Sequence, residues 1–239
     1  MVIKMEKVIQ FLDEKKGAII KGFVVFLLFF YGSYVQYLPV YLFHLDVHNI
    51  SDSMKVLLSS FSSIILVFVF FFLYRKELKK DFKKFWKNKM DYMDIGTKCW
   101  FAGLGIMMAS NLIITLVLKG GGAQNEKLVQ TMIHALPWLM IINAGILAPF
   151  NEEIVFRKTL YDVFGKYKWV FVILAFLLFG YAHVMSVAKV WTDYLYIIPY
   201  GVLGGAFALA YYKTDNFFTS VILHMVHNTI LILLSIIAL

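Results

Sequence analysis

The sequence predicts an all-α protein that crosses a membrane seven times. Of its 239 residues, 61% are hydrophobic and only 16% are charged, which is unlike a soluble globular domain. Each of the predicted spans lacks Asp, Glu, Lys and Arg and has roughly the 20 residues that an α-helix needs to cross the hydrocarbon core. Helices satisfy their own backbone hydrogen bonds in lipid, so we expect every span to be helical. The seven stretches are 22–43, 56–74, 99–118, 128–151, 169–188, 194–212 and 216–239.

Charge asymmetry predicts the orientation of these spans. Residues 75–89 hold eight Lys or Arg against two acids, whereas the loops at 44–55 and 119–127 are nearly neutral. Cytoplasmic loops carry the excess of Lys and Arg, so the loop at 75–98 is predicted to be cytoplasmic. The N-terminus then lies inside and, with seven spans, residue 239 lies outside.

The basic loop is also predicted to form an interfacial amphipathic helix around residues 76–90. Leu78, Phe82, Phe85 and Trp86 recur at helical spacing and define one apolar face, with lysines on the other side. Such a helix lies on the inner leaflet and is drawn to anionic lipids, which we expect as partners of the 75–90 segment. A nucleic-acid partner is not expected, because a topology signal and surface anchor explain the lysines.

Ionisable residues divide the chain into two regions. The first three spans carry few polar groups, mainly Gln36 and Asn111, whereas every ionisable residue inside a span comes later. We therefore predict an accessory membrane region at 1–124 and a working core of four spans at 125–239. The span at 194–212 is rich in Gly and Ala, which allow helices to pack closely.

The charged motif of the core is the adjacent pair Glu152 and Glu153. Neighbours on a helix point about 100° apart, so the two carboxylates have different surroundings. Glu153 and Arg157 are four residues apart and can form an ion pair on one helix face, which leaves Glu152 free on another. Residues 152–164 contain no Gly or Pro, so we expect the helix to continue to Phe164 and to place Glu152 below the cytoplasmic surface.

Histidines on two later spans are predicted to reach a similar depth. His183 lies one turn after Phe179, and His224 shares a helix face with Asn228. Ionisable groups inside a membrane are costly and usually functional. Their occurrence on three helices of one half of the chain points to a shared site.

These three ordered motifs resemble those of the CAAX protease and bacteriocin-processing family of intramembrane endopeptidases, also called the Abi family. The resemblance covers about residues 128–239. It implies a glutamate-dependent peptidase in which Glu152 activates a water and His183 helps hold it. It also implies that His224 and Asn228 stabilise the oxyanion, with Glu153, Arg157 and Phe179 in support.

A zinc-dependent version of the same peptidase remains open. Glu152, His183 and His224 are ligand types that could hold zinc and leave a position for water. The sequence lacks the H-E-x-x-H motif of zincins, and the resemblance favours the version without a metal or another cofactor.

Two other functions are compatible with parts of the sequence. A non-catalytic bacteriocin-immunity protein or membrane scaffold would not need Glu152, and a small transporter would use Glu and His as a proton relay. No inverted repeat supports the transporter. Membrane-bound peptides or proteins are the expected substrates, and a bacterial plasma membrane is the expected location.

Overall fold

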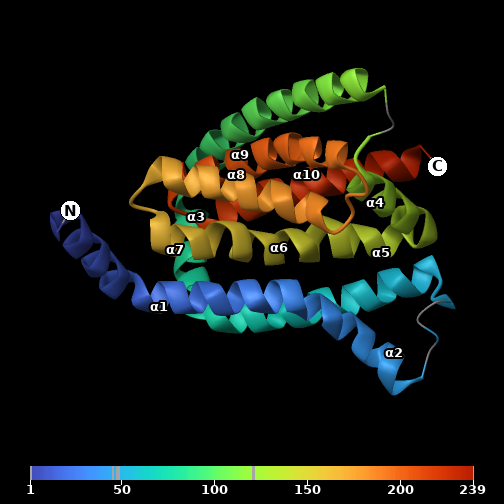
Figure 1. Ribbon diagram of the computed structural model, residues 1–239, viewed down its shortest axis with the longest axis horizontal. Helices are drawn as coiled ribbons and strands as arrows, with labels where there is room; N and C mark the ends of the chain where they lie inside the picture. The colour runs from blue at the N-terminus through green and yellow to red at the C-terminus, as the bar shows by residue number, and fades with distance from the viewer. Residues whose placement is uncertain (1, 45, 47–48, 120–121, 239) are drawn as a thin grey trace.

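The computed structural model describes residues 2–44, 46, 49–119 and 122–238, and in these ranges the chain is helical without any strand (Figure 1). The predicted all-α class is therefore confirmed. Shorter 3-10 turns are η1 (Ser33–Tyr37) and η5 (Trp191–Tyr196), and π-helical turns are η3 (Asn143–Leu147) and η4 (Ile154–Lys158). The α-helices are α1 (Val2–Gly32), α2 (Leu38–Leu42), α3 (Asp52–Leu118), α4 (Gln124–Ala135), α5 (Pro137–Ile142), α6 (Ala148–Glu153), α7 (Thr159–Phe164), α8 (Lys168–Met185), α9 (Ile197–Thr214) and α10 (Phe217–Ile237).

Six continuous helical stretches in the described part of the chain are long and apolar enough to cross a membrane. They confirm a polytopic integral membrane protein. Two of the seven predicted spans, 56–74 and 99–118, fall within the single helix α3, which explains the difference in number. The stretches are Ile9–Leu42, Asp52–Leu118, Pro137–Phe164, Lys168–Met185, Trp191–Thr214 and Phe217–Ile237.

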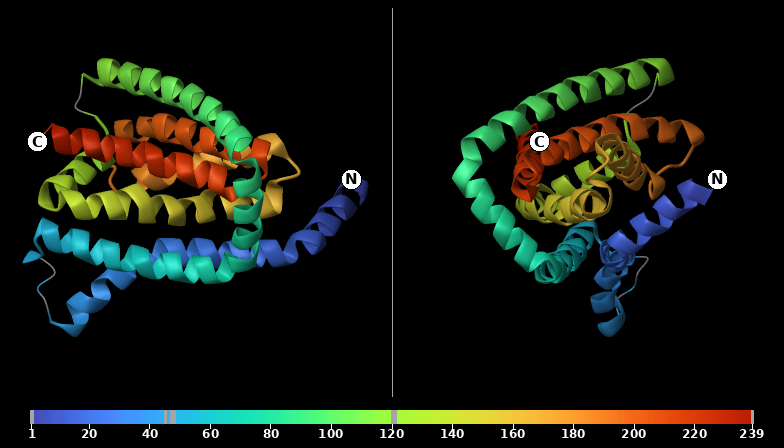
Figure 2. Two further views of the ribbon diagram at one scale, coloured as in Figure 1. Left: turned by 180° about the vertical axis from the view of Figure 1, so that it is seen from behind. Right: turned by 90° about the vertical axis from the view of Figure 1, so that its left-hand side faces the viewer.

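Helix α3 is long enough for two crossings and bends around one end of the bundle (Figure 2). Its 67 residues would extend about 100 Å if straight, more than three times the roughly 30 Å of a hydrocarbon core. The backbone leaves helical geometry at Asn88, with φ −120° and ψ 20°. The first limb, which contains the predicted span 56–74, runs beside α1. A middle segment around residues 76–90 crosses the end of the bundle, and the second limb, which contains the predicted span 99–118, returns along α9.

The middle segment of α3 corresponds to the predicted interfacial helix, but its apolar face is divided. Leu78 and Phe85 are buried in the bundle, whereas Phe82 and Trp86 are exposed. The rings of Phe82 and Phe85 both contact Phe218 at the start of α10. This segment therefore belongs to the protein core on one side and is open to its surroundings on the other.

The predicted span at 128–151 has the wrong start. Helix α4 ends at Ala135, and Leu136 leaves helical geometry, with φ −146° and ψ 76°. Pro137 explains the break, because its ring disfavours helical geometry at the preceding residue. The candidate span runs instead over Pro137–Phe164, so the expected continuation of the helix through residues 152–164 is confirmed.

Close helix packing joins the second limb of α3 to α9. A Cβ built on Gly103 would lie 2.4 Å from the Cβ of Ala206, closer than real side-chain contacts allow. Gly105, two residues later on the same helix, has nothing within 4 Å of such an atom. The missing side chain at Gly103 thus lets the two helices approach.

We expect Gly103→Ala to destabilise the protein and Gly105→Ala to leave its stability unchanged or raise it by up to about 1 kcal/mol, because Ala favours a helix over Gly. Overpacking of this kind costs about 1–3 kcal/mol, which lowers the unfolding midpoint of a chain of this size by about 2–12 °C. Thermal unfolding of the detergent-purified variants measures the difference. Equal midpoints for the two variants would contradict the close contact.

Candidate active site

Two π-helical turns flank the glutamate pair. Glu152 and Glu153 end α6, with η3 before this helix and η4 directly after it. Pro149 follows η3 and has no N–H to donate to the preceding turn, which accounts for the irregular backbone hydrogen-bond pattern of the helix there. Single π-helical turns occur frequently at functional sites. As predicted from their adjacency, the two side chains part, and Glu153 is fully buried whereas 15% of Glu152 is exposed.

Glu153 lies in a buried charge network. Its Oε1 is 3.0 Å from Nη1 of Arg157, an ion pair by distance, and 2.9 Å from Nδ1 of His224. Arg157 also donates from Nη2 to the carbonyl oxygen of Gly204 on α9 at 3.1 Å. The predicted Glu153–Arg157 pair is confirmed, and it connects three helices through fully buried charges.

Glu152 faces two imidazole rings. Its Oε2 lies 3.9 Å from Nε2 of His183 and 3.6 Å from Nε2 of His224. These separations exceed a direct hydrogen bond, and this buried oxygen has no hydrogen-bond partner among the described residues. Polar groups separated in this way can share a water. The structure thus brings together the three groups that the sequence placed at one depth.

Hydrogen bonds on the far side of each ring determine which nitrogen faces Glu152. Nδ1 of His183 is 2.9 Å from the carbonyl oxygen of Phe179, which can only accept, so Nδ1 donates. Nδ1 of His224 likewise donates to the Glu153 carboxylate. Both Nε2 atoms are therefore directed at the site, and neutral His183 offers a lone pair there.

Aromatic rings hold these imidazoles in place. The Phe179 ring centroid is 4.2 Å from that of His183 and 5.6 Å from that of His224, and it also lies 4.4 Å from the Arg157 guanidinium. Tyr200 stacks on His183 with centroids 4.8 Å apart. The predicted supporting position of Phe179 thus has a geometric basis, and Tyr200 is an addition that the sequence did not reveal.

Asn228 lines the same cavity as Glu152, His183 and His224, one turn after His224 on α10. Its Nδ2 donates to the carbonyl oxygen of Ala144 in η3 at 2.9 Å. The amide has a second N–H that this bond does not use. Asn228 can therefore be oriented by one hydrogen bond and offer another to a ligand.

A contact from the N-terminal region reaches the site helix. Nε1 of Trp100, on the second limb of α3, donates to Nδ1 of His227 at 3.3 Å. The two residues are 127 positions apart, so no local sequence signal could have predicted the bond. His227 also lines the cavity and lies three residues after His224 in the chain.

The zinc alternative depends on how the three side chains are arranged. Two imidazole nitrogens and a carboxylate match the ligands of catalytic zinc sites. Among the described residues, however, no group of three His, Cys, Asp or Glu side chains is arranged to hold a metal ion. The donor types nevertheless fit those of a catalytic zinc site.

Residues 134–230 match the family model described as type II CAAX prenyl endopeptidase Rce1-like. All seven predicted site residues lie in this range, so the resemblance to CAAX proteases is confirmed for this part of the chain. No solved structure matches the chain significantly.

Two bacterial relatives match about half of the chain. "Putative membrane peptidase YdiL" of Bacillus subtilis is 27% identical over 117 residues, which cover 48% of this chain and 44% of the relative. The UPF0177 protein YaiF of Lactococcus lactis is 29% identical over 108 residues, or 45% of this chain and 46% of the relative. The matched region is thus less than half the length of either relative.

We expect Arg157→Met to destabilise the protein strongly, because it leaves the Glu153 charge buried beside His224 alone. Breaking a buried pair costs about 3–5 kcal/mol, whereas replacing both partners often costs little. The double variant Glu153→Gln/Arg157→Met should therefore regain most of the lost stability. Unfolding midpoints in detergent measure both effects.

Glu77→Gln is the matched control for this pair. It breaks the partly exposed Lys21–Glu77 ion pair, for which we expect a loss of about 1 kcal/mol or less. A double variant no more stable than Arg157→Met would contradict the interpretation that an unpaired buried charge causes the loss.

Proposed function

We propose that this protein is an intramembrane endopeptidase that hydrolyses a peptide bond of a membrane-associated protein or peptide precursor. The observation that carries the proposal is the position of Glu152, whose carboxylate faces Nε2 of His183 and of His224 within 4 Å. The family match of residues 134–230 and the name of the Bacillus relative support the same class of reaction. Both relatives are bacterial, which favours a bacterial plasma membrane as the location.

In the proposed reaction Glu152 is the general base. A water between Glu152 and His183 donates one hydrogen to each, since Nε2 of neutral His183 can accept. As Glu152 takes its proton, the water oxygen attacks the scissile carbonyl carbon. The same carboxyl group then passes this proton to the leaving nitrogen, the C–N bond breaks, and a new carboxylic acid and amine are released. General acid–base catalysis of this kind contributes about 10²–10⁴-fold.

His224 and Asn228 are the proposed oxyanion donors. Nδ1 of His224 already donates to Glu153, so an N–H at Nε2 requires the imidazolium form. The two neighbouring carboxylates, Glu152 and Glu153, stabilise that positive charge. The unused N–H of Asn228 supplies a second donor, and removing one such donor typically lowers kcat by about 10²–10³-fold.

We expect Glu152→Gln to abolish cleavage while the protein still folds and inserts, because the amide keeps the shape and loses the base. Comparative peptidomics of membranes that contain the wild type or the variant measures the outcome. Fragments that require the peptidase should disappear with Glu152→Gln and persist with the control Glu77→Gln. Unchanged fragments with Glu152→Gln would overturn the mechanism.

The same comparison separates the metal-free reaction from the zinc-dependent one. We propose that the reaction needs no metal. The purified protein should therefore produce the same fragments from membrane extracts in the presence of a strong chelator. Elemental analysis should find no stoichiometric zinc. Loss of cleavage on chelation, with recovery on adding zinc, would favour Glu152, His183 and His224 as metal ligands instead.

A second proposal concerns lipid at the bend of α3, where we infer a site for an anionic phospholipid. A cavity of about 550 Å³ combines an apolar lining, formed by Phe71, Leu78, Phe82 and Phe218, with three cations. The cations are Arg75, Lys76 and Lys79. Acyl chains fit the apolar lining, and the headgroup phosphate fits the cations, each worth about 1 kcal/mol near an anionic surface.

Replacing Arg75, Lys76 and Lys79 together with Gln should reduce retention of phosphatidylglycerol more than that of phosphatidylcholine. Native mass spectrometry of the protein purified from mixed micelles measures bound lipid. The control replaces Lys83, Lys87 and Lys89 with Gln, which removes the same charge outside the cavity. Equal losses in the two triple variants would show general electrostatic attraction in place of a site.

A further inference from the structure

The cavity that contains the site extends from it in one direction along the bundle. It has a volume of about 790 Å³ and includes Glu152, His183 and His224. On α10 its lining continues from His224 toward the C-terminal end of the helix through Asn228 and Ser235. From Glu152 it continues backward through Ala148 and Ala144 toward the start of the span at Pro137.

The opposite direction is closed by buried side chains. Residues 153–160, which follow Glu152, are all buried. On α10 before His224, Phe217, Thr219 and Ser220 are fully buried, and Phe218 and Ile222 are half-buried. Neither stretch lines the cavity. The site is therefore the floor of a cavity whose remaining lining lies toward one end of the molecule.

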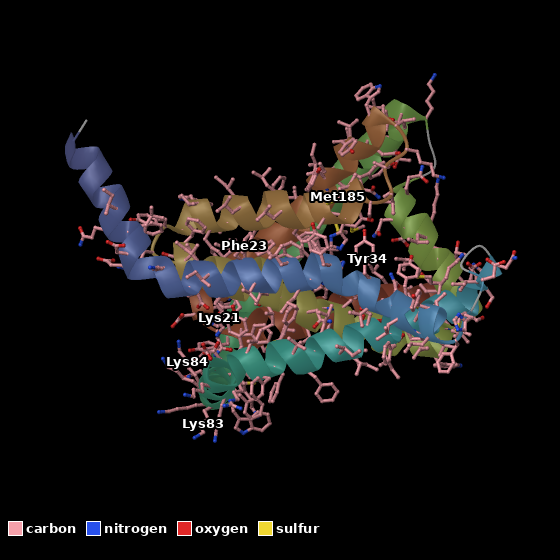
Figure 3. The ribbon with its side chains drawn as sticks, turned by 60° about the horizontal axis from the view of Figure 1, so that its bottom comes forward. Lys21, Phe23, Tyr34, Lys83, Lys84 and Met185 are labelled. Carbon is pink, nitrogen blue, oxygen red and sulfur yellow. The ribbon has the colours of Figure 1, made fainter. Side chains whose placement is uncertain are left out.

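Charges identify the closed end as the cytoplasmic one. The bend of α3, with its eight Lys or Arg in residues 75–89, lies at that end, where Lys84 forms an ion pair with Asp215 in the turn between α9 and α10 at 2.9 Å. Figure 3 places Lys83 and Lys84 at this bend and Met185, two residues after His183, away from it. By the excess of Lys and Arg the bend is cytoplasmic, so the cavity extends to the outer face.

The outer part of the cavity is lined by both polar and apolar groups. Asn125 and Gln130 of α4 and Ser235 of α10 supply hydrogen-bonding groups, and Val129, Ile133 and Leu231 supply apolar surface. An extended peptide needs such a mixture, because its backbone groups require partners while its side chains can be apolar.

We infer that the substrate enters from the outer face of the membrane, so that the scissile bond belongs to an extracytoplasmic peptide segment next to an apolar anchor. This inference rests on the proposed function and names the side and class of its substrate. It distinguishes this protein from a peptidase that processes cytoplasmic tails.

Cysteine labelling in intact cells tests the inference. The chain has one Cys, Cys99, so Cys99→Ala provides a background without thiols. Single cysteines are then introduced as Ser235→Cys in the cavity, Lys127→Cys on the exposed side of α4, and Lys80→Cys at the bend. A membrane-impermeant maleimide should label the first two in intact cells and Lys80→Cys only after permeabilisation.

A second readout uses the membrane peptide fragments that Glu152→Gln abolishes. Labelling of Ser235→Cys should reduce these fragments to the level of Glu152→Gln, whereas labelling of Lys127→Cys should leave them unchanged. Reversed accessibility of Lys80→Cys and Ser235→Cys would overturn the outer opening. Labelled Ser235→Cys with undiminished fragments would overturn the entry route. Failure of the peptidase proposal is distinguishable, because fragments would then not depend on Glu152 in unlabelled cells.

Discussion

The site depends on one buried carboxylate. Glu153 is fully buried, and a buried charge without partners is destabilising by several kcal/mol. Arg157 on the same helical span and His224 on α10 both reach its Oε1, and Arg157 continues to a backbone oxygen of α9. These contacts hold three helices in one register. They also orient His224, because the ring must direct Nδ1 at Glu153 and thus Nε2 at the cavity.

Adjacency in sequence then gives Glu152 its own environment. With Glu153 held by the network, the roughly 100° between neighbours on a helix turns Glu152 to the cavity, where its Oε2 lacks a hydrogen-bond partner among the described residues. A paired carboxylate with strong partners is a structural group, and an unpaired one in a cavity is available for chemistry. The two adjacent glutamates therefore have different surroundings in the fold, as their spacing from Arg157 predicts. The different roles proposed for Glu152 and Glu153 follow from the packing around each side chain.

Local spacing explains which features were predictable from the sequence. The Glu153–Arg157 pair follows from a separation of four residues, and the continuation to Phe164 follows from the absence of Gly and Pro. The lack of charge in 128–151 predicts one continuous span, whereas Pro137 interrupts the helix at Leu136, so charge alone does not locate the start of this span. The bond between Trp100 and His227 and the stacking of Tyr200 on His183 depend on tertiary packing, for which the sequence carries no periodic signal.

The second limb of α3 bears on how the proposed accessory region at 1–124 could act. This limb supplies Met107 and Asn111 to the cavity and Trp100 to the bond with His227. Asn111 is exposed on a mostly apolar limb, where burying a polar amide in lipid is costly unless the amide has a hydrogen-bond partner. A peptide backbone in the cavity would provide one. The N-terminal region is then a wall of the substrate route, so variation there can alter which segment reaches Glu152 while the catalytic groups stay unchanged.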